Sequence, residues 1–293
     1  MSGVAPKPFL KWAGGKTWML EHLDGAMPVC WGRHFEPFLG GGAFALHRLH
    51  TRRATRAVLS DTSRPLMITW LSVQRRPEDV AKELERLPLV LQKRQYEELR
   101  LEHNMRTPNA EFRVDPVYAA RMIWLNHACF NGLWRENRKG WMNTPVGSYK
   151  KVSLPTPEEL FAVAYAIRDA ELQVSDFREV MRTAGESGDH VYCDPPYVPL
   201  SDTAHFTAYG DCWDGDASQR LLAEEARRAS KKDVLVVLTN HRTPYVETEL
   251  YPSPPFRHVV VEKAGRSISA SAKGRAKVEE LIVSIGGPAD TSA

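Results

Sequence analysis

A turn of three glycines separates two candidate strands early in the chain. Residues 33–39 are rich in apolar and aromatic side chains and lead into Gly40-Gly41-Gly42, after which apolar residues recur at helical spacing. The next apolar run, 57–61, ends in Asp61, about twenty residues beyond the turn. Nucleotide-binding α/β folds place a carboxylate at this spacing on ribose hydroxyls. The pattern predicts strand, turn, helix and strand around a nucleoside site.

Two other nucleotide sites share parts of this sequence. Gly40, Gly42 and Ala45 satisfy the dinucleotide fingerprint, so a nicotinamide-dependent oxidoreductase stays open at this point. The segment Gly14-Gly15-Lys16-Thr17 ends like a phosphate-binding loop. However, Leu10 stands where the leading glycine of that loop belongs, and no candidate strand precedes it. We therefore expect no triphosphate site.

The remaining chain divides into a helical part and a strand-rich part. From Pro77 onward the apolar spacing is helical: Val80, Leu84 and Leu87 share one face, and Asp115-Pro116 can cap a later helix. Further strands are expected at 191–193, 234–238, 259–261 and 281–285, with a helix at 218–230. Strands that alternate with helices predict a largely parallel sheet. We expect an α/β fold, with a Rossmann-like sheet in 1–66 and 158–293 and an inserted helical subdomain in 67–157.

The composition is that of a soluble globular enzyme. Hydrophobic residues make up 43% of the 293 residues and charged residues 26%, enough to bury a sizeable core. Because the net charge is only +3, any nucleic-acid site must come from local clustering of Lys and Arg. The four scattered cysteines favour neither a zinc cluster nor a disulfide framework. With no apolar run of membrane-spanning length, we expect a cytoplasmic protein. We expect a monomer, because no spare apolar stripe stands out, and we expect no metal.

The run 191–193 ends in Asp194-Pro195-Pro196-Tyr197, which carries the most specific chemistry. Each proline ring fixes φ and removes an N–H donor, so the turn is stiff and presents acceptors. The Asp194 carboxylate and the Pro195 carbonyl can hold both hydrogens of an exocyclic amine while Tyr197 stacks on its ring. An adenine amine is a poor nucleophile because its lone pair is delocalised, and a pull on both N–H bonds makes the nitrogen more tetrahedral. The turn indicates methylation of a base amino group, with Asp194 as the orienting group.

Three segments, in the same order, resemble the Dam-type DNA adenine N6-methyltransferases: 9–16, Glu36-Pro37-Phe38 with its glycines, and Asp194 to Tyr197. The resemblance covers nearly the whole chain and continues in 126–132, 147–151, 206–209, 239–241 and 266–269. It implies a site-specific transfer from S-adenosylmethionine (SAM) to N6 of adenine in double-stranded DNA, with base flipping and a GATC target. The sequence leaves open whether a restriction nuclease accompanies the enzyme in a restriction-modification system.

The resemblance also implies which residues bind SAM. By similarity, the residues lining the cofactor site are Trp12, Lys16, Glu36, Phe38 and Gly40. Asp61 takes the ribose hydroxyls, in agreement with its spacing, and Asp176 and Phe177 hold the cofactor's adenine. The family usually has Asn where this chain has Ser63, which puts a neighbouring contact in doubt. Without the resemblance, Trp12 would be interpreted as a half-buried core residue and Glu36 as a surface acid.

Basic and aromatic residues interleave between residues 131 and 151, where Glu136 is the only acid. Such residues can contact phosphates and stack on or wedge between bases, although a charged run is also compatible with a solvated face. By the resemblance, Phe130 enters the base stack beside the flipped adenine, Leu133 and Arg135 read base edges, and Lys11 contacts a target guanine. The further DNA contacts implied are Asn131, Tyr149 and Lys150.

Some features of the DNA-binding part depart from the family or stay ambiguous. Trp134 and Ser148 stand where relatives often carry other residues, which puts the exact target in doubt. A second basic stretch suits either a phosphate-contacting loop or a solvated hairpin, and its members are Lys263, Arg266, Lys273, Arg275 and Lys277.

The same residues also discriminate between adenine methylation and several other functions. Cytosine C5 methylation needs a cysteine nucleophile, but Cys193 precedes the acid at a strand end, where we expect its side chain to pack. Cytosine N4 methylation uses a similar turn, often with Ser in place of the acid, so Asp194 favours adenine. RNA or protein amide methylation would not need the basic aromatic tract. A DNA-binding protein that only holds SAM and does no catalysis has no use for two acceptors, and turnover with SAM and duplex DNA would exclude this alternative.

Overall fold

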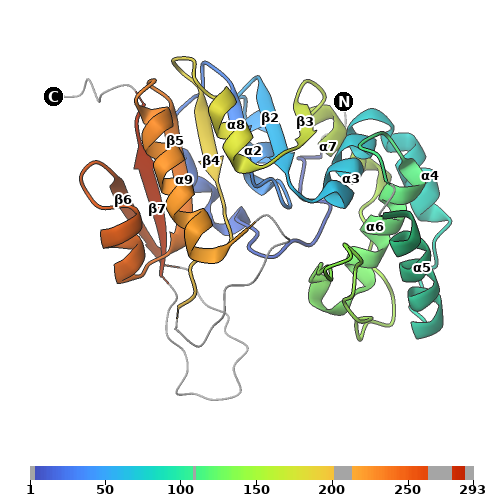
Figure 1. The fold of residues 1–293 in the computed structure, drawn as a ribbon. Coiled ribbons are helices and arrows are strands. Elements are labelled where there is room, and N and C mark those ends of the chain that lie inside the picture. The colour runs from blue at the N-terminus through green and yellow to red at the C-terminus, as the bar shows by residue number, and fades with distance from the viewer. Residues whose placement is uncertain (1–3, 108–109, 201–212, 263–278, 288–293) are drawn as a thin grey trace. The chain divides into compact units, whose positions relative to one another are not determined.

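The computed structural model describes residues 4–107, 110–200, 213–262 and 279–287 (Figure 1). The chain divides into two compact units. Unit 1 comprises Met1–Thr17 and Leu39–Asp176, and unit 2 comprises Trp18–Phe38 and Phe177–Ala293. Each unit contains both strands and helices, so the chain is of the mixed α/β class that the sequence predicts.

Unit 1 contains two parallel strands and a helix that contacts one of them. Strand β2 (Ala57–Asp61) pairs with β3 (Glu171–Val174). Helix α2 (Ala43–His50) follows the glycines and contacts β2. The predicted helix and the predicted strand ending in Asp61 are thus confirmed. Strand β3 was not predicted from the sequence, because Glu171 and Gln173 interrupt its short apolar run.

The other described α-helices of unit 1 are α3 (Arg64–Arg75), α4 (Pro77–Glu85), α5 (Lys93–Arg106), α6 (Pro116–Ala128) and α7 (Pro157–Ala166). All of them except α5 have proline at their first or second position, a recognisable start signal. Asp115 caps α6 as predicted, since its carboxylate accepts a hydrogen bond from the Tyr118 N–H at 2.9 Å. Thr156 and Glu159 form a capping box at the start of α7.

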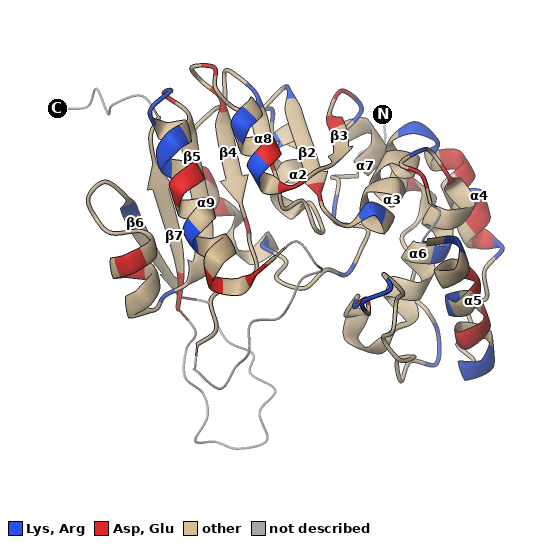
Figure 2. Cartoon of the chain, in the orientation of Figure 1, with Lys and Arg blue, Asp and Glu red and all other residues tan. Residues whose placement is uncertain are grey.

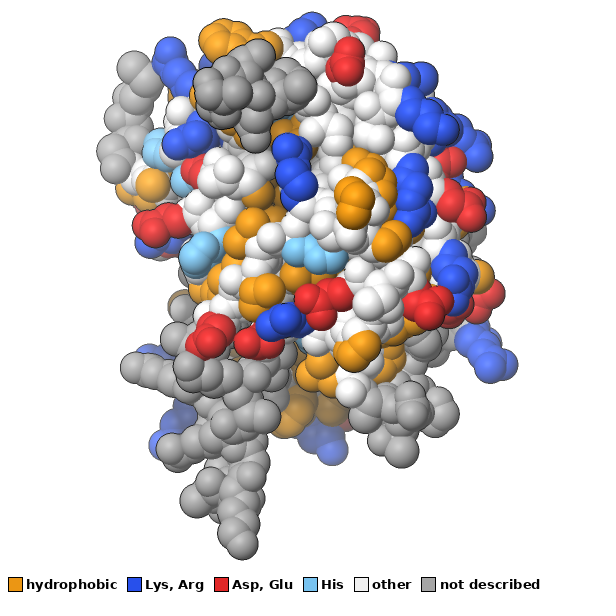
Figure 3. Space-filling view, turned by 90° about the vertical axis from the view of Figure 1, so that its left-hand side faces the viewer, with side chains coloured by type: hydrophobic (Ala, Val, Ile, Leu, Met, Phe, Trp, Pro, Cys, Tyr) orange, Lys and Arg blue, Asp and Glu red, His pale blue; other side chains and the backbone are white. Residues whose placement is uncertain are grey.

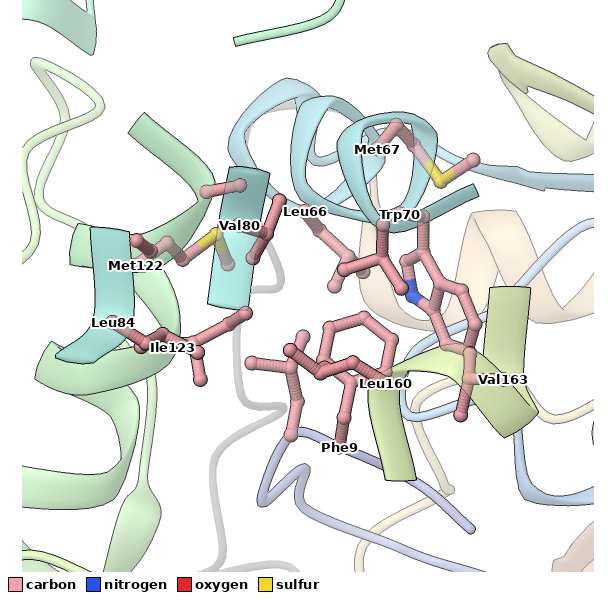
Figure 4. Close-up of a cluster of buried hydrophobic side chains, with 14 of the residues drawn as sticks. Phe9, Leu66, Met67, Trp70, Val80, Leu84, Met122, Ile123, Leu160 and Val163 are labelled. Carbon is pink, nitrogen blue, oxygen red and sulfur yellow. The ribbon is translucent and has the colours of Figure 1, made fainter. Parts of the chain in front are cut away.

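The hydrophobic core of unit 1 lies between α3, α4, α6 and α7 (Figure 4). Trp70 of α3 meets Phe9 edge-on, with ring centroids 4.6 Å apart, and Leu84 of α4 packs in the same cluster as Ile123 of α6. Full burial of one such side chain contributes about 1.5 to 3 kcal/mol, so this cluster holds the helices together. Helix α4 ends before Leu87, which the sequence pattern placed on its face; Leu87 still packs, half-buried, against the core.

The boundaries of the two compact units differ from the functional boundaries predicted from sequence. Helix α3 contacts β2 and β3 as well as α4 and α6, so the helices of the predicted insertion share one unit with part of the sheet. The assignment of 67–157 to a recognition subdomain stays a prediction.

Unit 2 contains five of the described strands, in the order β1-β4-β5-β7-β6. They are β1 (His34–Glu36), β4 (His190–Cys193), β5 (Leu235–His241), β6 (Arg257–Glu262) and β7 (Glu279–Ile285). Strand β4 pairs in parallel with β1 and β5, whereas β7 is antiparallel to both β5 and β6. The sheet is largely parallel, as expected, and among the described strands of this unit β7 alone runs against the others. The sequence pattern does not reveal that β7 inserts between β5 and β6.

The helices of unit 2 pack beside these strands, and β6 is at the edge. They are α1 (Leu20–Ala26), α8 (Phe177–Thr183) and α9 (Gly215–Ser230), with short helical turns η1 (Thr17–Met19), which begins in unit 1, and η4 (Val246–Leu250). Helix α9 contacts α8 and β5. Val259 and Val260 of β6 remain 47% and 41% exposed. Figure 3 faces this side and shows apolar side chains interspersed with charged ones, and charges flanking an edge strand discourage pairing with other chains.

Candidate active site

Strand β4 brings the Asp-Pro-Pro-Tyr turn to the carboxyl end of parallel strands. All four residues of β4 are buried, and the strand lies between β1 and β5. Asp194 follows directly and is half-buried. The hydroxyl of Thr239 in β5 donates to Asp194 Oδ1 at 2.8 Å. One oxygen of the carboxylate is thereby oriented, at the edge where α/β sheets bind their ligands.

Residues of β5 and α9 fix the backbone of the turn. The Asn240 amide oxygen accepts from the Val198 N–H at 2.9 Å, and His241 Nδ1 donates to the Val198 carbonyl at 2.8 Å. Gln219 Nε2 donates to the Pro196 carbonyl at 2.6 Å. Gln219 thus engages the carbonyl of Pro196, whereas the sequence prediction assigns the carbonyl of Pro195 to a substrate amine. Sequence reasoning missed Gln219, since nothing in the pattern of α9 marks it.

The surroundings of the turn keep the Tyr197 hydroxyl and the Cys193 thiol protonated. Burial, followed by the charges of Asp194 and Glu280, raises the pKa of Tyr197 well above its usual value. Burial, followed by the charges of Glu36 and Asp194, likewise raises the pKa of the Cys193 thiol. Since the thiolate is the nucleophilic form of cysteine, the protonated thiol argues against cytosine C5 chemistry at this strand.

Glu36 lies buried on β1 and not at the surface. Only 2% of its surface is exposed, and its Oε1 lies 3.0 Å from Nε2 of His34, two residues earlier and on the same face of the strand. Its interpretation as a surface acid is therefore wrong, because β1 is a covered strand at all of its positions. A buried carboxylate is unfavourable unless it is partnered, and His34 is one such partner of Glu36.

Three aromatic rings of unit 2 pack together. Phe38 stacks on Phe177 with ring centroids 5.5 Å apart, and Trp213 meets Phe38 edge-on at 5.6 Å. The fold thus brings together two residues, distant in sequence, that the resemblance assigns to the cofactor. Trp213 was missed, because an isolated Trp forms no recognisable pattern. Aromatic faces of this kind suit a planar ligand ring.

Unit 1 holds the glycine turn against Asp61. The Gly40 N–H donates to Asp61 Oδ2 at 3.1 Å, and the Ser63 N–H donates to Oδ1 at 3.0 Å. Burial raises the pKa of Asp61, and these N–H groups oppose that effect. Gly40 has φ +48°, and a Cβ there would lie 2.8 Å from Trp12 Cδ1. Only glycine fits so close to the indole. The Ser63 hydroxyl caps α3 by accepting from the Leu66 N–H.

The other predicted cofactor residues of unit 1 are also placed. Asp176 lies two residues beyond β3, whose last residue, Val174, is opposite Asp61, so the two acids follow neighbouring strand ends. Lys16 is 5% exposed, and its Nζ donates to the Gly14 carbonyl. Trp12 is half-buried and packs against the core of unit 1, so its aromatic face has a fixed support.

The predicted base readers lie in a hairpin segment, here called the ribbon, which contains an isolated antiparallel bridge between Glu136 and Met142. The Asn143 N–H donates to the Arg135 carbonyl at 3.0 Å. Leu133 and Arg135 are exposed and alternate with Trp134 and Glu136, whose side chains are joined by an indole N–H to Oε1 hydrogen bond of 2.8 Å. A two-stranded β-ribbon can enter the DNA major groove, and both predicted readers are exposed on this hairpin segment; their role as base readers stays a prediction.

Helix α5 holds the ribbon in place. The Asn104 side-chain amide bonds to both the N–H and the carbonyl of Met142, at 2.8 and 2.9 Å. The Tyr96 hydroxyl donates to the Thr144 carbonyl at 2.8 Å. These supporting residues were not identified from the sequence, where they look like ordinary positions of a polar helix. Acidic and basic residues both occur along α5 (Figure 2), and Lys93 and Arg94 form ion pairs with Glu97 and Glu98 one turn later.

Lys11 lies close to Tyr149, another predicted DNA contact of unit 1. Its backbone N–H donates to Asn126 Oδ1 at 2.7 Å, and its Nζ lies 5.0 Å from the Tyr149 ring centroid. Gly132 has φ +66°, and a Cβ there would lie 2.5 Å from Lys11 Cβ, so only glycine allows this approach. Phe130 is 47% exposed, which suits a ring that stacks on bases.

The two remaining predicted DNA contacts are also at the surface. Asn131 and Lys150 are exposed, and Asn131 has φ +54°, a conformation that Asn tolerates better than most residues. Several predictions fall outside the described residues: the family segments 206–209 and 266–269 and the second basic stretch from Lys263 to Lys277.

In the part of the chain that the structure describes, no group of three or more His, Cys, Asp or Glu side chains is arranged to hold a metal ion. Among the helices of that same part, none is long and apolar enough to cross a membrane.

Known proteins match nearly the whole chain. A family model described as D12 class N6 adenine-specific DNA methyltransferase matches residues 12–268. The chain is 35% identical over 284 residues to a DNA adenine methylase of Serratia marcescens, covering 94% of this chain and 97% of that protein. It is 33% identical to a DNA adenine methylase of Vibrio cholerae, with 94% and 95% covered. It is 30% identical to a type II methyltransferase of Lactococcus lactis subsp. cremoris, with 94% of each covered.

Proposed function

Because the chain belongs to the D12 class of N6 adenine-specific DNA methyltransferases, we propose that it methylates N6 of a flipped adenine within GATC, with SAM as the methyl donor. The observation that carries the proposal is the Asp194 carboxylate, which Thr239 orients at the start of the stiff Asp-Pro-Pro-Tyr turn. The second acceptor that we assign to the substrate amine is the Pro195 carbonyl. Two acceptors in this arrangement match the two hydrogens of an exocyclic amine.

The residues present fit SAM. When bound, SAM supplies an electrophilic methyl group on a sulfonium that leaves as a neutral thioether. Gly40 provides a backbone surface beside Trp12 that any side chain would fill, and Asp61 offers carboxylate oxygens to ribose hydroxyls. The full set assigned to the cofactor is Trp12, Lys16, Glu36, Phe38, Gly40, Asp61, Asp176 and Phe177.

The residues of the Asp-Pro-Pro-Tyr turn activate the amine. Asp194 and the Pro195 carbonyl accept its two hydrogens, which draws the nitrogen toward a tetrahedral geometry and frees its lone pair. Tyr197 stacks on the base. Flipping the base costs a few kcal/mol, and holding amine and methyl in attack geometry can recover that cost. In this mechanism Asp194 orients the amine, and the proton that the nitrogen loses afterwards passes to solvent or to Asp194.

The ribbon and its neighbours read the DNA. Leu133 and Arg135 contact base edges, Lys11 contacts a guanine, and Phe130 fills the gap left in the base stack. Phosphate and sugar contacts come from Asn131, Tyr149 and Lys150. We assign residues 67–157 to target recognition and residues 1–66 with 158–293 to catalysis. The enzyme acts as a monomer on DNA in the cytoplasm.

Sequencing of DNA from a methylation-free host that expresses this protein tests the proposal, with a host expressing Asp194→Ala as control. N6-methyladenine in GATC supports the full proposal. N6-methyladenine in another context retains the mechanism and overturns the target. N4-methylcytosine overturns the choice of base, and DNA without any modified base overturns the proposed activity.

A further inference from the structure

Glu280 is a buried carboxylate for which the methyl-transfer mechanism has no role. Only 6% of its surface is exposed, and it lies opposite His241 in the antiparallel pairing of β5 with β7. Its Oε2 accepts a hydrogen bond of 2.8 Å from the hydroxyl of Tyr197, which is 83 residues away in sequence. Since burying a carboxylate is unfavourable unless it is hydrogen-bonded, the phenol is an important partner of this acid.

Besides a side-chain hydrogen bond with Thr239, the Tyr197 side chain has two contacts that orient its ring. Its hydroxyl lies on the axis about which the ring rotates, so the bond to Glu280 fixes the direction of that axis. The ring of His241 meets the Tyr197 ring edge-on, with centroids 4.8 Å apart and an interplanar angle of 81°, and so restricts rotation about the axis. His241 is itself anchored through the Val198 carbonyl, one residue beyond Tyr197. Together these contacts define the plane of the ring.

In the hydrogen bond between Tyr197 and Glu280, the donor and the acceptor do not exchange roles. The raised pKa of Tyr197 keeps its hydroxyl protonated at neutral pH, so the phenol donates and the carboxylate accepts. Hydrogen bonds to a charged acceptor are stronger than those between neutral groups. The bond therefore persists before any substrate arrives.

We propose that Glu280 is a positioning residue for methyl transfer, which sets the Tyr197 ring in the plane on which the flipped base stacks. The inference rests on the stacking role assigned to Tyr197 in the proposed function. A ring that is ordered in advance spares the complex the entropic cost of ordering it on binding. Loss of the bond therefore slows the chemical step and leaves SAM binding unchanged.

The test compares Glu280→Ala, Glu280→Gln, Tyr197→Phe and the double variant Tyr197→Phe/Glu280→Ala. Single-turnover methylation of duplex DNA, with enzyme in excess, removes product release from the measured rate. We expect Glu280→Ala to slow transfer about tenfold, equivalent to about 1.4 kcal/mol. Glu280→Gln keeps an acceptor oxygen and should recover most of that rate. Because both groups act through one bond, the double variant should be no slower than Glu280→Ala.

The neighbouring Glu279 provides a matched control. It lies on the same strand, and its carboxylate accepts from Arg242 at 3.0 Å. Glu279→Ala removes the same charge from β7 without touching Tyr197, so the single-turnover rate should not change. SAM affinity and thermal unfolding, measured for every variant, separate a positioning effect from damage to the fold.

Three results would overturn the inference: Glu280→Gln as slow as Glu280→Ala, losses that multiply in the double variant, or SAM affinity that falls in parallel with the rate. If the wild-type protein methylates adenine and Glu280→Ala does so equally fast, only the role of Glu280 fails. If the wild-type protein methylates no adenine, the proposed function fails first.

Discussion

Replacing Gly40 with alanine should weaken both the fold around the glycine turn and the binding of SAM. The residue has φ +48°, and the left-handed conformation costs an L-residue about 1 to 2 kcal/mol. The added Cβ would lie 2.8 Å from Trp12 Cδ1, so the indole must move. Overpacking of this kind costs about 1 to 3 kcal/mol. The free energy of unfolding should therefore fall by about 2 to 5 kcal/mol.

Urea denaturation followed by circular dichroism measures the first effect, and calorimetric titration with SAM measures the second. Since Gly40 and Trp12 are both assigned to the cofactor, the Kd for SAM should rise at least about tenfold if displacing the indole costs about 1.4 kcal/mol of binding. Gly25→Ala is the control, because this glycine lies in helix α1 with nothing within 4 Å of an added Cβ. It should change stability by about 1 kcal/mol at most. A Gly40→Ala variant as stable as wild type, with unchanged SAM affinity, would refute the reasoning.

Three further substitutions test the site. Asp194→Ala should abolish transfer from tritiated SAM while SAM and DNA binding persist; wild-type turnover would contradict the orienting role of Asp194. Cys193→Ala should retain adenine methylation, because burial raises the thiol pKa and keeps it protonated at neutral pH; complete loss of activity in a folded variant would argue for a cysteine nucleophile. Arg135→Ala should lose about 1 to 3 kcal/mol of discrimination at one base pair, measured by methylation of single-mismatch duplexes, whereas equal loss on all duplexes would indicate a phosphate contact.

The family and the main chemical residues could be predicted because their signals are local. Asp194 to Tyr197 follow a buried strand directly, and Asp61 ends the next strand after the glycine turn. The family match confirms the resemblance built on these segments. Helix starts such as Asp115 were also predictable, because a cap requires only a side chain and the N–H three residues later. The roles of the individual site residues remain predictions.

The contacts that hold the site could not be predicted from the sequence. The burial of Glu36 depends on what covers β1, and the bond between Tyr197 and Glu280 depends on β7 lying next to β5. Asn104 supports the ribbon only because α5 packs beside it. The residues of a strand show which side chains alternate between its two faces, but they do not show which strands pair with it. The pairing is fixed when segments distant in sequence bury their apolar faces together. The sequence alone therefore determined the chemistry that this chain can perform, while tertiary packing decided which side chains orient those groups.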